Sequence, residues 1–545
     1  AKSQAVEIAG GAGMILYNVD DVSSLVSDNH YVPSLHTNNT DGLVIKDYIA
    51  ANEAPTATLS GGTKTSAQGS VMAAFSSRGP NAATGAADLI QPDVTAPGVN
   101  VLAGNTPTAL SGAPGQLFQA ISGTSMSSPH VAGAFALLKQ AHPDWSPAAA
   151  KSALMTTSRQ DVVKEDGVTP ADPFDMGAGH IVPTTALSPG IVYDAGFLDY
   201  LGFLCEAAPE VFSDAAATCA SLVGLGIPTD GSELNVPSIG IAELVGAQTV
   251  TRTVTDVSGV RDRYRITAEA PPGVSVEVSP RVLRVPANGS ASYTVTFTAN
   301  DDAALGEWAF GSVTLSGIRH GAVAYSPTAV KPALFDAAAQ VSGTGTDGSA
   351  EFSATFGYTG DYTAAAHGME PAVGAADSVN QDPDQTFDPS DVGAGATAHT
   401  FDLTGMAFAR FALPPESVAD AGLTDLDMFV YDPSGTLVGS STNGGTDETV
   451  DVALPDAGVY TVYVHGWLVN TDPEPYTLYS WIVSATPGGS LVIDSAPASA
   501  TLGATETIDV SWSGLDAGTM YLGAVSHTGP DGLLGFTLVQ VSTFE

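Results

Sequence analysis

The sequence predicts a partial α/β unit in the N-terminal part of the chain, followed by all-β sandwich domains. Up to about residue 230, short apolar runs alternate with Gly- and Pro-rich turns and with helical patterns such as SPHVAGAFALLKQAH. Beyond about Glu233, apolar residues recur with a period of two, which is typical of antiparallel strands. A chain of 545 residues also exceeds what one hydrophobic core normally serves, so several domains are expected.

The first 60 residues predict a small α/β layer. GMILYNV is a short apolar strand, and LVIKDYIAAN follows a polar turn with the pattern of a short helix. From Ser66 to Pro183, AAFSSRGP and QPDVTAPGVNVLAG predict strands, and two helical patterns follow them. The second helix should start at Ser146, since a serine before a proline supplies a capping hydroxyl ahead of a residue without an N–H group.

The C-terminal regions predict antiparallel sandwiches. In ASYTVTFTA, residues Tyr293, Val295 and Phe297 face one side and the intervening threonines face the other. GVSVEVSP repeats this alternation, so a sandwich of about 100 residues is expected to end near Val330. A second all-β region follows VKPALF, and the tail from about Gly488 predicts another small sheet.

The chain is strongly acidic. It has 17 Lys and Arg against 58 Asp and Glu, a formal net charge of −41. This charge repels phosphate backbones and anionic lipid headgroups, which disfavours nucleic-acid and membrane-surface partners. It is compatible with a secreted, salt-tolerant or calcium-binding protein and also with simple solubility. No apolar run approaches the roughly 20 residues of a membrane span, so no membrane anchoring is expected within this chain.

Cys205 and Cys219 are the two cysteines of the chain. A disulfide between them would close a short loop, stabilise the fold by about 3 kcal/mol and require an oxidising compartment. Two unpaired buried thiols are the alternative. A metal site is not expected, because no histidines lie nearby to complete a tetrahedral shell.

Ser125, in GTSMSSPHVAG, is the candidate catalytic residue. A nucleophilic serine must be exposed, lie near a general base, and sit where N–H groups can bind the developing oxyanion. The pattern predicts a glycine turn that leads into a long buried helix. Such a turn can expose the serine, and the helix N-terminus favours the negative charge of the oxyanion. A hydroxyl that merely caps the helix would produce the same local pattern.

The whole segment GTSMSSPHVAGAFALL closely resembles the active-site serine segment of subtilisin-like serine proteases. AAFSSRGP and PDVTAPGVNVLA resemble the strands that precede it, and AHPDWSPAAAKSALMTTS, PFDMGAGHIVPTTALSPGIVYD and DYLGFLC extend the resemblance to large plant and bacterial subtilases. The resemblance implies a partial subtilisin-like core over residues 61–230, with a mostly parallel sheet and helices on both faces. It also implies that Ser125 is the acylating nucleophile, that its N–H is an oxyanion donor, and that His130 is not the base. On a helix that begins near Ser125, His130 faces a different side, which favours a packed histidine.

The sequence departs from the family pattern ahead of Ser125. Subtilases place an aspartate in D-[ST]-G, a histidine in H-G-T and an asparagine oxyanion donor before the serine. None of these settings precedes Gly123, and the upstream histidines, His30 and His36, lie in other contexts. VEIAGGAGMILYNV and YVPSLHTNNTDGLVIKDYI resemble the protease-associated domain inserted between that asparagine and the serine. Residues 1–60 are therefore expected to be its C-terminal part, with Asp, His and Asn upstream and the chain alone nearly inactive.

Two further resemblances concern the β regions. LNVPSIGI, TVTRTVTDV and PPGVSVEVSPRVL resemble a fibronectin type III-like domain, expected at 231–333. DLDMFVYDPSGTLVGSS and AGVYTVYVHGW resemble a bacterial pre-peptidase C-terminal domain, expected at 334–487, with a C-terminal β region at 488–545. Asp425, Asp427 and Asp432 are calcium candidates, although such turns also occur without metal.

These resemblances together imply a secreted serine endopeptidase that acts on proteins or peptides, requires no cofactor and has calcium as an optional ion. The alternative is a non-catalytic extracellular binding protein in which a degenerate protease core carries β-sandwich modules. No cleavage preference is predicted, because most of the specificity pocket is expected upstream.

Overall fold

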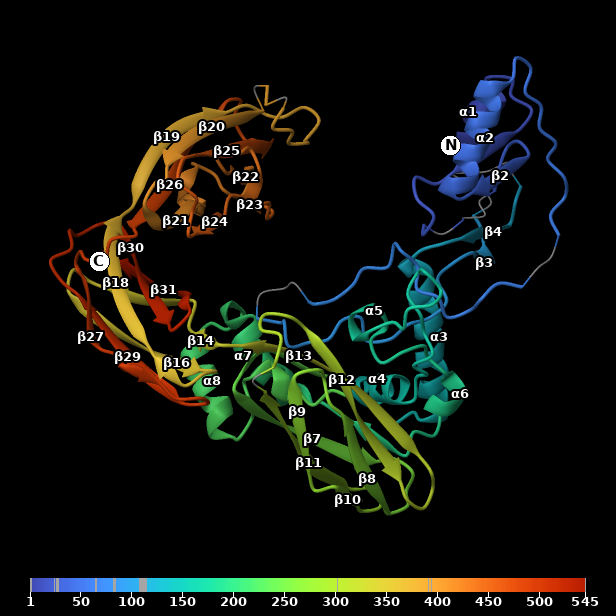
Figure 1. Ribbon diagram of the computed structural model, residues 1–545, viewed down its shortest axis with the longest axis horizontal. Helices are drawn as coiled ribbons and strands as arrows, with labels where there is room; N and C mark the ends of the chain where they lie inside the picture. Colours follow the sequence, from blue (N-terminus) through green and yellow to red (C-terminus); the bar gives the residue numbers. More distant parts are fainter. Residues whose placement is uncertain are drawn as a thin grey trace. The chain divides into compact units, whose positions relative to one another are not determined.

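Figure 1 shows the computed structural model of the chain. The structure describes residues 2–23, 25, 29–63, 66–81, 85–106, 115–300, 302–390, 392–393 and 395–544. The chain divides into two compact units, Ala1–Pro332 and Ala333–Glu545.

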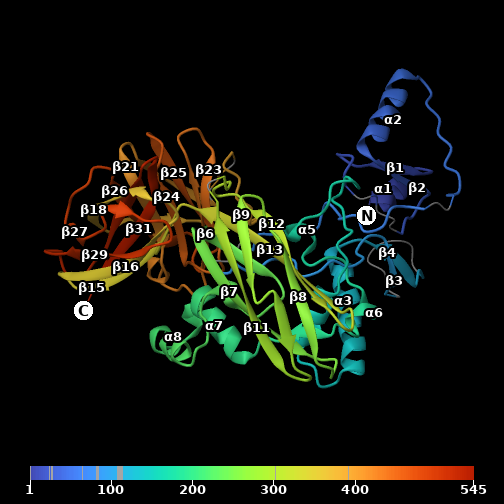
Figure 2. The same ribbon diagram turned by 60° about the horizontal axis from the view of Figure 1, so that its bottom comes forward.

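The N-terminal segment is a small α/β layer, as the sequence predicts (Figures 1 and 2). Strands β1 (Met14–Tyr17) and β2 (Ser34–Thr37) pair in parallel, and helices α1 (Lys2–Ile8) and α2 (Asn39–Ala51) flank them. Asn38 caps α2, because its side chain accepts the N–H of Asp41 at 2.9 Å. Gly42 allows α2 to approach β1 closely, since an added Cβ would lie 2.3 Å from the ring of Tyr17.

Residues 61–230 contain short strands and most of the helices of the first unit. The elements are β3 (Val101–Gly104), β4 (Phe118–Ile121), α3 (Thr124–Ala141), α4 (Pro147–Thr156), α5 (Pro173–Met176), α6 (Pro183–Ala186), β5 (Ile191–Tyr193), α7 (Phe197–Ala207), η1 (Pro209–Val211) and α8 (Ala215–Gly224). The short helix η2 (Gly231–Glu233) follows directly after this range. Parallel bridges join Val71 to Val163 and Thr95 to His180, whereas β3 and β4 are antiparallel. Among the described helices, none has the length and apolar content needed to cross a lipid bilayer.

Helix α4 starts where the sequence places it. Ser146 occupies the N-cap, its hydroxyl accepts the N–H of Ala149 at 2.9 Å, and Pro147 is the first helical residue. Most of α4 is buried between its neighbours.

The expectation of a buried helix after Ser125 is wrong in one respect. Helix α3 forms over 18 residues, but only Ala134 and Leu138 among its described side chains are buried. Because α3 packs on α4 and α6 along one side, the other side remains accessible, and Leu137 is 55% exposed. The apolar run predicted the helix correctly and its burial incorrectly.

The region after η2 is a sandwich of two antiparallel sheets. One sheet has the order β10-β8-β12-β13-β6 and the other the order β5-β7-β11-β9. The strands not yet placed are β6 (Ile239–Val245), β7 (Ala247–Asp256), β8 (Asp262–Glu269), β9 (Val274–Ser279), β10 (Val282–Val285), β11 (Ser290–Ala299), β12 (Ala309–Gly317) and β13 (Val323–Ala333).

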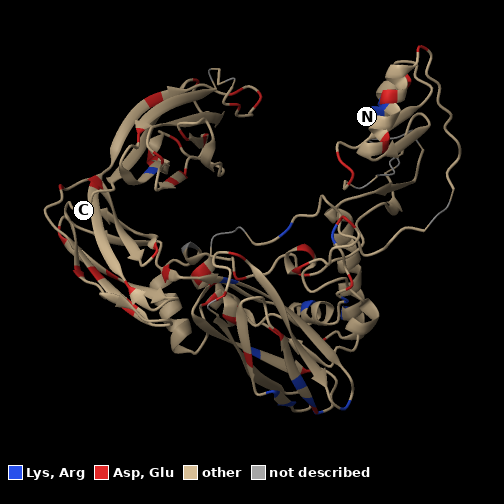
Figure 3. Ribbon diagram, viewed as in Figure 1, with Lys and Arg blue, Asp and Glu red and all other residues tan. Residues whose placement is uncertain are grey.

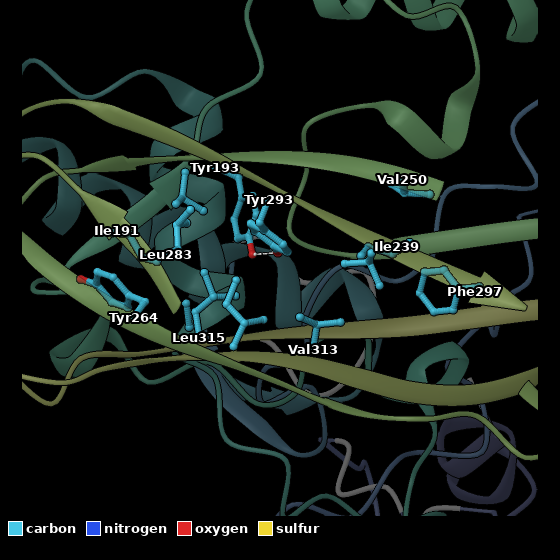
Figure 4. Packing of buried hydrophobic residues seen from close by; sticks show 14 of the residues in the cluster. Ile191, Tyr193, Ile239, Val250, Tyr264, Leu283, Tyr293, Phe297, Val313 and Leu315 are labelled. Atoms are coloured by element: carbon cyan, nitrogen blue, oxygen red, sulfur yellow. Dashed lines mark hydrogen bonds between the residues drawn. The ribbon is translucent and has the colours of Figure 1, made fainter. Parts of the chain in front are cut away.

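The predicted alternation in β11 is confirmed by the core of this sandwich (Figure 4). Tyr293, Val295 and Phe297 are almost fully buried between the sheets. Strand β5 extends the second sheet and adds Ile191 and Tyr193 to the same core. Strand β5, which lies between α6 and α7 in the sequence, is therefore part of the sandwich.

The second unit contains two sandwiches. The strands of the inner sandwich are inserted in the sequence between the first and the last strands of the outer sandwich. The inner sandwich has sheets β19-β26-β21-β24 and β20-β25-β22-β23. Its elements are β19 (Val373–Val379), β20 (Ala396–Asp402), β21 (Met406–Leu413), η3 (Pro415–Ser417), β22 (Asp425–Tyr431), β23 (Leu437–Ser441), β24 (Glu448–Ala453), β25 (Val459–Leu468) and β26 (Glu474–Ser484).

The outer sandwich combines strands from both ends of the unit. Its sheets are β14-β16-β29-β27 and β15-β31-β30-β18, with a small pair β17-β28. The strands are β14 (Phe335–Ala337), β15 (Gln340–Thr344), β16 (Gly348–Phe356), β17 (Gly360–Asp361), β18 (Thr363–Pro371), β27 (Leu491–Ser495), β28 (Ser499–Ala500), β29 (Thr505–Trp512), β30 (Met520–Gly529) and β31 (Gly532–Ser542). This pairing differs from the sequence-based division into 334–487 and 488–545, because residues before 372 share both sheets with residues after 490.

The outer sandwich should lose stability in mild acid because of His527. This side chain is fully buried, with Nδ1 2.6 Å from the Tyr362 hydroxyl and Nε2 3.0 Å from Thr537 Oγ1. Burial lowers the pKa of His527 to about 4. As the pH falls below about 6.5, His527 becomes protonated in the unfolded chain but stays neutral in the folded chain. The free energy of unfolding should therefore drop by about 3 kcal/mol towards pH 4.

Urea unfolding of the chain at a series of pH values measures this loss. His527→Gln can still hydrogen bond but does not titrate, so its pH dependence between about 6.5 and 4 should be flatter than that of the native chain. Equal slopes for the two proteins would contradict the assignment.

Candidate active site

Ser125 is the second residue of helix α3 and is exposed. Gly123 holds the N-cap position, and no side chain makes a capping hydrogen bond there. The hydroxyl of Ser125 therefore does not cap the helix, which was the alternative interpretation of this serine. Its N–H lies in the first turn of an 18-residue helix, where amide groups lack intrahelical partners and favour negative charge.

A close contact between two loops sets the start of this helix. The Gly123 N–H donates to the Gly98 carbonyl at 2.8 Å, and the Met126 N–H donates back to the Gly123 carbonyl at 2.9 Å. An added Cβ at Gly98 would lie 2.3 Å from Ser127 Oγ, so the approach requires glycine there. Nearby, the Asn100 N–H donates to Ser122 Oγ at 2.8 Å. These bonds orient the chain that presents Ser125.

The histidines of the chain lie apart from Ser125. His130 is exposed and its Nδ1 is 2.9 Å from the Met126 carbonyl, so it is not the packed residue that was expected. His36 Nε2 is 2.7 Å from Asn18 Oδ1 in the N-terminal layer, and His30 is half-buried. Within the described residues, no hydrogen bond joins Ser125 Oγ to a histidine.

A pocket of about 670 Å³ adjoins the first turns of α3. Thr124, Ser127 and Ser128 line one side of the pocket, and Arg159 and His180 belong to its wall. His180 Nδ1 lies 3.3 Å from Ser70 Oγ and 3.4 Å from the guanidinium of Arg159. Burial, together with the positive charge of Arg159, lowers the pKa of His180. No sequence motif marks His180 as a site residue, because its partners Ser70 and Arg159 come from other parts of the chain.

Cys205 and Cys219 form a disulfide that joins α7 to α8. The disulfide is confirmed, and the alternative of two unpaired buried thiols is wrong.

The three calcium candidates are not brought together as one site. Asp425 Oδ1 accepts the Gly445 N–H at 3.1 Å, and Asp427 Oδ2 lies 3.0 Å from His465 Nδ1. Asp432 accepts the N–H groups of two residues of its own turn, both at 2.8 Å.

Among the described residues, the acidic groups close enough to share one ion are Asp88, Glu206 and Asp230. No sequence motif marks these three, because the fold brings them together from separate segments.

His465 lies between two carboxylates of the inner sandwich. Its Nδ1 faces Asp427, its Nε2 is 2.8 Å from Asp382 Oδ2, and its side chain is almost fully buried. Burial alone lowers the pKa of His465, but the hydrogen bonds and charges of Asp427 and Asp382 outweigh burial, so the pKa is raised. The His465 ring therefore joins β25 to β22 and to the segment after β19.

The raised pKa gives a testable pH effect. His465 should stabilise the inner sandwich below about pH 6.5, and this contribution should disappear as the pH rises through the folded-state pKa. NMR titration of the His465 ring should show a pKa above about 6.5 in the native chain and a lower one in Asp382→Asn. Asp384→Asn is the control, since the Asp384 carboxylate accepts a backbone N–H of its own turn. An unchanged His465 titration in Asp382→Asn would refute the interpretation.

Comparison with known families assigns three segments of the chain. Residues 25–179 match the subtilase family, residues 233–330 match the fibronectin type-III domain, and residues 391–466 match the bacterial pre-peptidase C-terminal domain. The order of these segments agrees with the resemblances noted in the sequence.

Similar proteins include plant proteases. The chain is 42% identical over 353 residues to the subtilisin-like protease SBT1.7 of Arabidopsis thaliana, covering 60% of this chain and 45% of that protein. It is 35% identical over 337 residues to a CO(2)-response secreted protease of the same plant, covering 58% and 43%. The chain thus spans less than half the length of these relatives.

Likeness to solved structures adds nothing to this assignment. Tripeptidyl peptidase 2 aligns with 77% of this chain and 46% of its own at 10% identity, with a TM-score of 0.24. A score this low does not support an argument about the fold.

Proposed function

We propose that this chain, which belongs to the subtilase family through its residues 25–179, carries the nucleophile of a serine endopeptidase. One observation carries the proposal: Ser125 is exposed at the start of an 18-residue helix whose cap position is held by Gly123. Its hydroxyl is therefore free for chemistry in the position that the GTSMSSPHVAG resemblance assigns to the acylating serine.

The proposed reaction is acyl transfer. Ser125 Oγ attacks the carbonyl carbon of a peptide bond while its proton passes to a general base, and the amine leaves as an acyl-enzyme forms. The N–H of Ser125, at the positive end of α3, is the proposed donor to the oxyanion that develops during attack. Water then releases the acyl group. Proton transfer and oxyanion binding need only side-chain and backbone groups, so the proposal includes no cofactor.

We assign the general base, its orienting aspartate and the second oxyanion donor to residues outside these 545. The H-G-T and D-[ST]-G settings do not occur before Gly123, and no described histidine bonds to Ser125. Removing a member of such a triad costs on the order of 10⁴ in rate. The chain by itself should therefore acylate poorly, and the whole protein should be active on proteins or peptides.

We further propose an extracellular location for the whole protein. The Cys205–Cys219 disulfide is stable where the environment is oxidising, and one similar plant protein is named a secreted protease. Residues 1–60 are proposed to be the C-terminal part of a protease-associated domain, on the resemblance of their sequence and their small α/β layer.

Covalent labelling tests the role of Ser125. In the full-length protein, a fluorophosphonate probe should label the native serine, and Ser125→Ala should lower labelling and peptidase kcat/KM by about 10³-fold or more, because the attacking oxygen is absent. Peptide mapping of the labelled protein locates the modified residue.

Ser221→Ala provides the matched control. Ser221 is also an exposed helical serine, but its hydroxyl donates to the Ala217 carbonyl, and its replacement should leave labelling unchanged. Strong labelling of the isolated 545-residue chain at Ser125 would show that a base is present here and would overturn the assignment of the base to other residues. Full activity of Ser125→Ala would overturn the proposed function itself.

A further inference from the structure

Six arginines gather at one end of the 231–333 sandwich, although the chain has only 17 Lys and Arg in all (Figure 3). All six side chains are exposed. We call them the arginine face: Arg261, Arg263, Arg265, Arg281, Arg284 and Arg319.

Strand pairing explains why these residues meet. On β8, Tyr264 and Ile266 point into the core, so Arg263 and Arg265 lie on the outer side of the strand. The rise along a strand places their Cα atoms about 6.8 Å apart. On the neighbouring strand β10, Arg284 is the direct partner of Arg263.

The other arginines belong to turns at the same end. The Ile266 N–H donates to the Arg281 carbonyl at 3.0 Å, which places Arg281 beside β8. The Ile318 N–H donates to the Arg263 carbonyl at 2.9 Å and brings the turn that contains Arg319 to the same strand. Arg261 directly precedes β8.

The guanidinium groups of the arginine face have no ion-pair partner among the described residues. None of its six guanidinium groups makes an ion pair or a side-chain hydrogen bond there. The acidic residue within the face, Asp262, is buried, and its carboxylate accepts the backbone N–H groups of Arg263 at 2.6 Å and of Arg319 and His320 at 3.2 Å. That carboxylate orders the turn instead of neutralising a guanidinium.

The core of the sandwich contains none of these six arginines. Like charges directly opposite each other on paired strands, such as Arg263 and Arg284, destabilise a sheet. Arg252 of the same sandwich shows the contrasting structural use, because it is buried and donates to the carbonyls of Val236, Thr251 and Ser238. An unfavourable, exposed set of like charges points to a binding role.

We propose that the arginine face binds a short Asp- and Glu-rich segment of a partner protein. Guanidinium groups bind carboxylates through paired N–H donors. An extended peptide presents alternate side chains on one side about every 6.8 Å, which matches the spacing of Arg263 and Arg265.

The charge of the rest of the chain favours a short ligand. A long stiff polyanion, such as duplex DNA, or an anionic membrane would reach beyond the arginine face by more than the Debye length of about 8 Å. Outside the face it would meet the field of a chain with net charge −41. A peptide of a few acidic residues stays within the basic end of the sandwich.

Binding of a fluorescein-labelled deca-glutamate peptide, followed by anisotropy in about 0.05 M salt, tests the proposal. The triple variant R263Q/R284Q/R319Q should bind the peptide about tenfold more weakly than the native chain, since three charge pairs are removed. Raising the salt to about 0.2 M should weaken binding by the native chain more than binding by the variant.

The control variant K2Q/K46Q/K139Q removes the same amount of charge from exposed residues elsewhere and should bind like the native chain. Thermal unfolding checks that R263Q/R284Q/R319Q folds, and its Tm should equal or exceed the native value because like-charge repulsion is relieved.

Three results would overturn the proposal. The native chain could fail to bind the peptide, or the lysine control could lose as much affinity as the arginine variant. The third is tighter, arginine-dependent binding of a single-stranded oligonucleotide, of polygalacturonate or of phosphatidylserine vesicles than of the peptide.

Discussion

The hydrogen bond between the Gly123 amide and the Gly98 carbonyl is the contact on which the candidate active site depends. It brings the segment before α3 against a loop that is distant in sequence, at a separation that only glycine at position 98 permits. With Gly123 at the cap, the first helical turn begins without a capping side chain. The hydroxyl of Ser125 and its N–H are thereby both left accessible at the positive end of the helix dipole.

The sandwich after this region is joined to it through a shared core. Strand β5 completes the sheet that contains β7 and β11, and the Tyr193 hydroxyl lies 2.7 Å from that of Tyr293. The backbone N–H of Tyr193 also donates to Ser152 Oγ of α4 at 2.8 Å. Because α4 packs against α3, the sandwich core supports the helix that presents Ser125 through two successive contacts. The fibronectin type-III domain is therefore a structural part of the first unit.

Local patterns in the sequence were sufficient to predict those structural features that depend only on residues adjacent in the chain. Period-two alternation identified Tyr293, Val295 and Phe297 as core residues, because a strand must turn alternate side chains to one side. Ser146 before Pro147 located the start of α4, because capping involves only residues of the first helical turn. The glycine turn singled out Ser125 without distinguishing a nucleophile from a cap, and the resemblance of the GTSMSSPHVAG string to subtilases favoured the nucleophile.

Tertiary structure alone decided which strands pair and which charges meet. The alternation in β16 and β29 predicts strands, but their pairing joins residues about 150 positions apart, and period two does not specify a partner. The same non-local pairing places His465 beside Asp427 and aligns Arg263 with Arg284. By itself, the sequence determined local elements such as α4 and β11 and the resemblance of the GTSMSSPHVAG segment to subtilases. Contacts between distant segments were decided by the pairing and register of the strands. Each register is set by the need to bury one face of the strand, which the sequence of that strand alone does not specify.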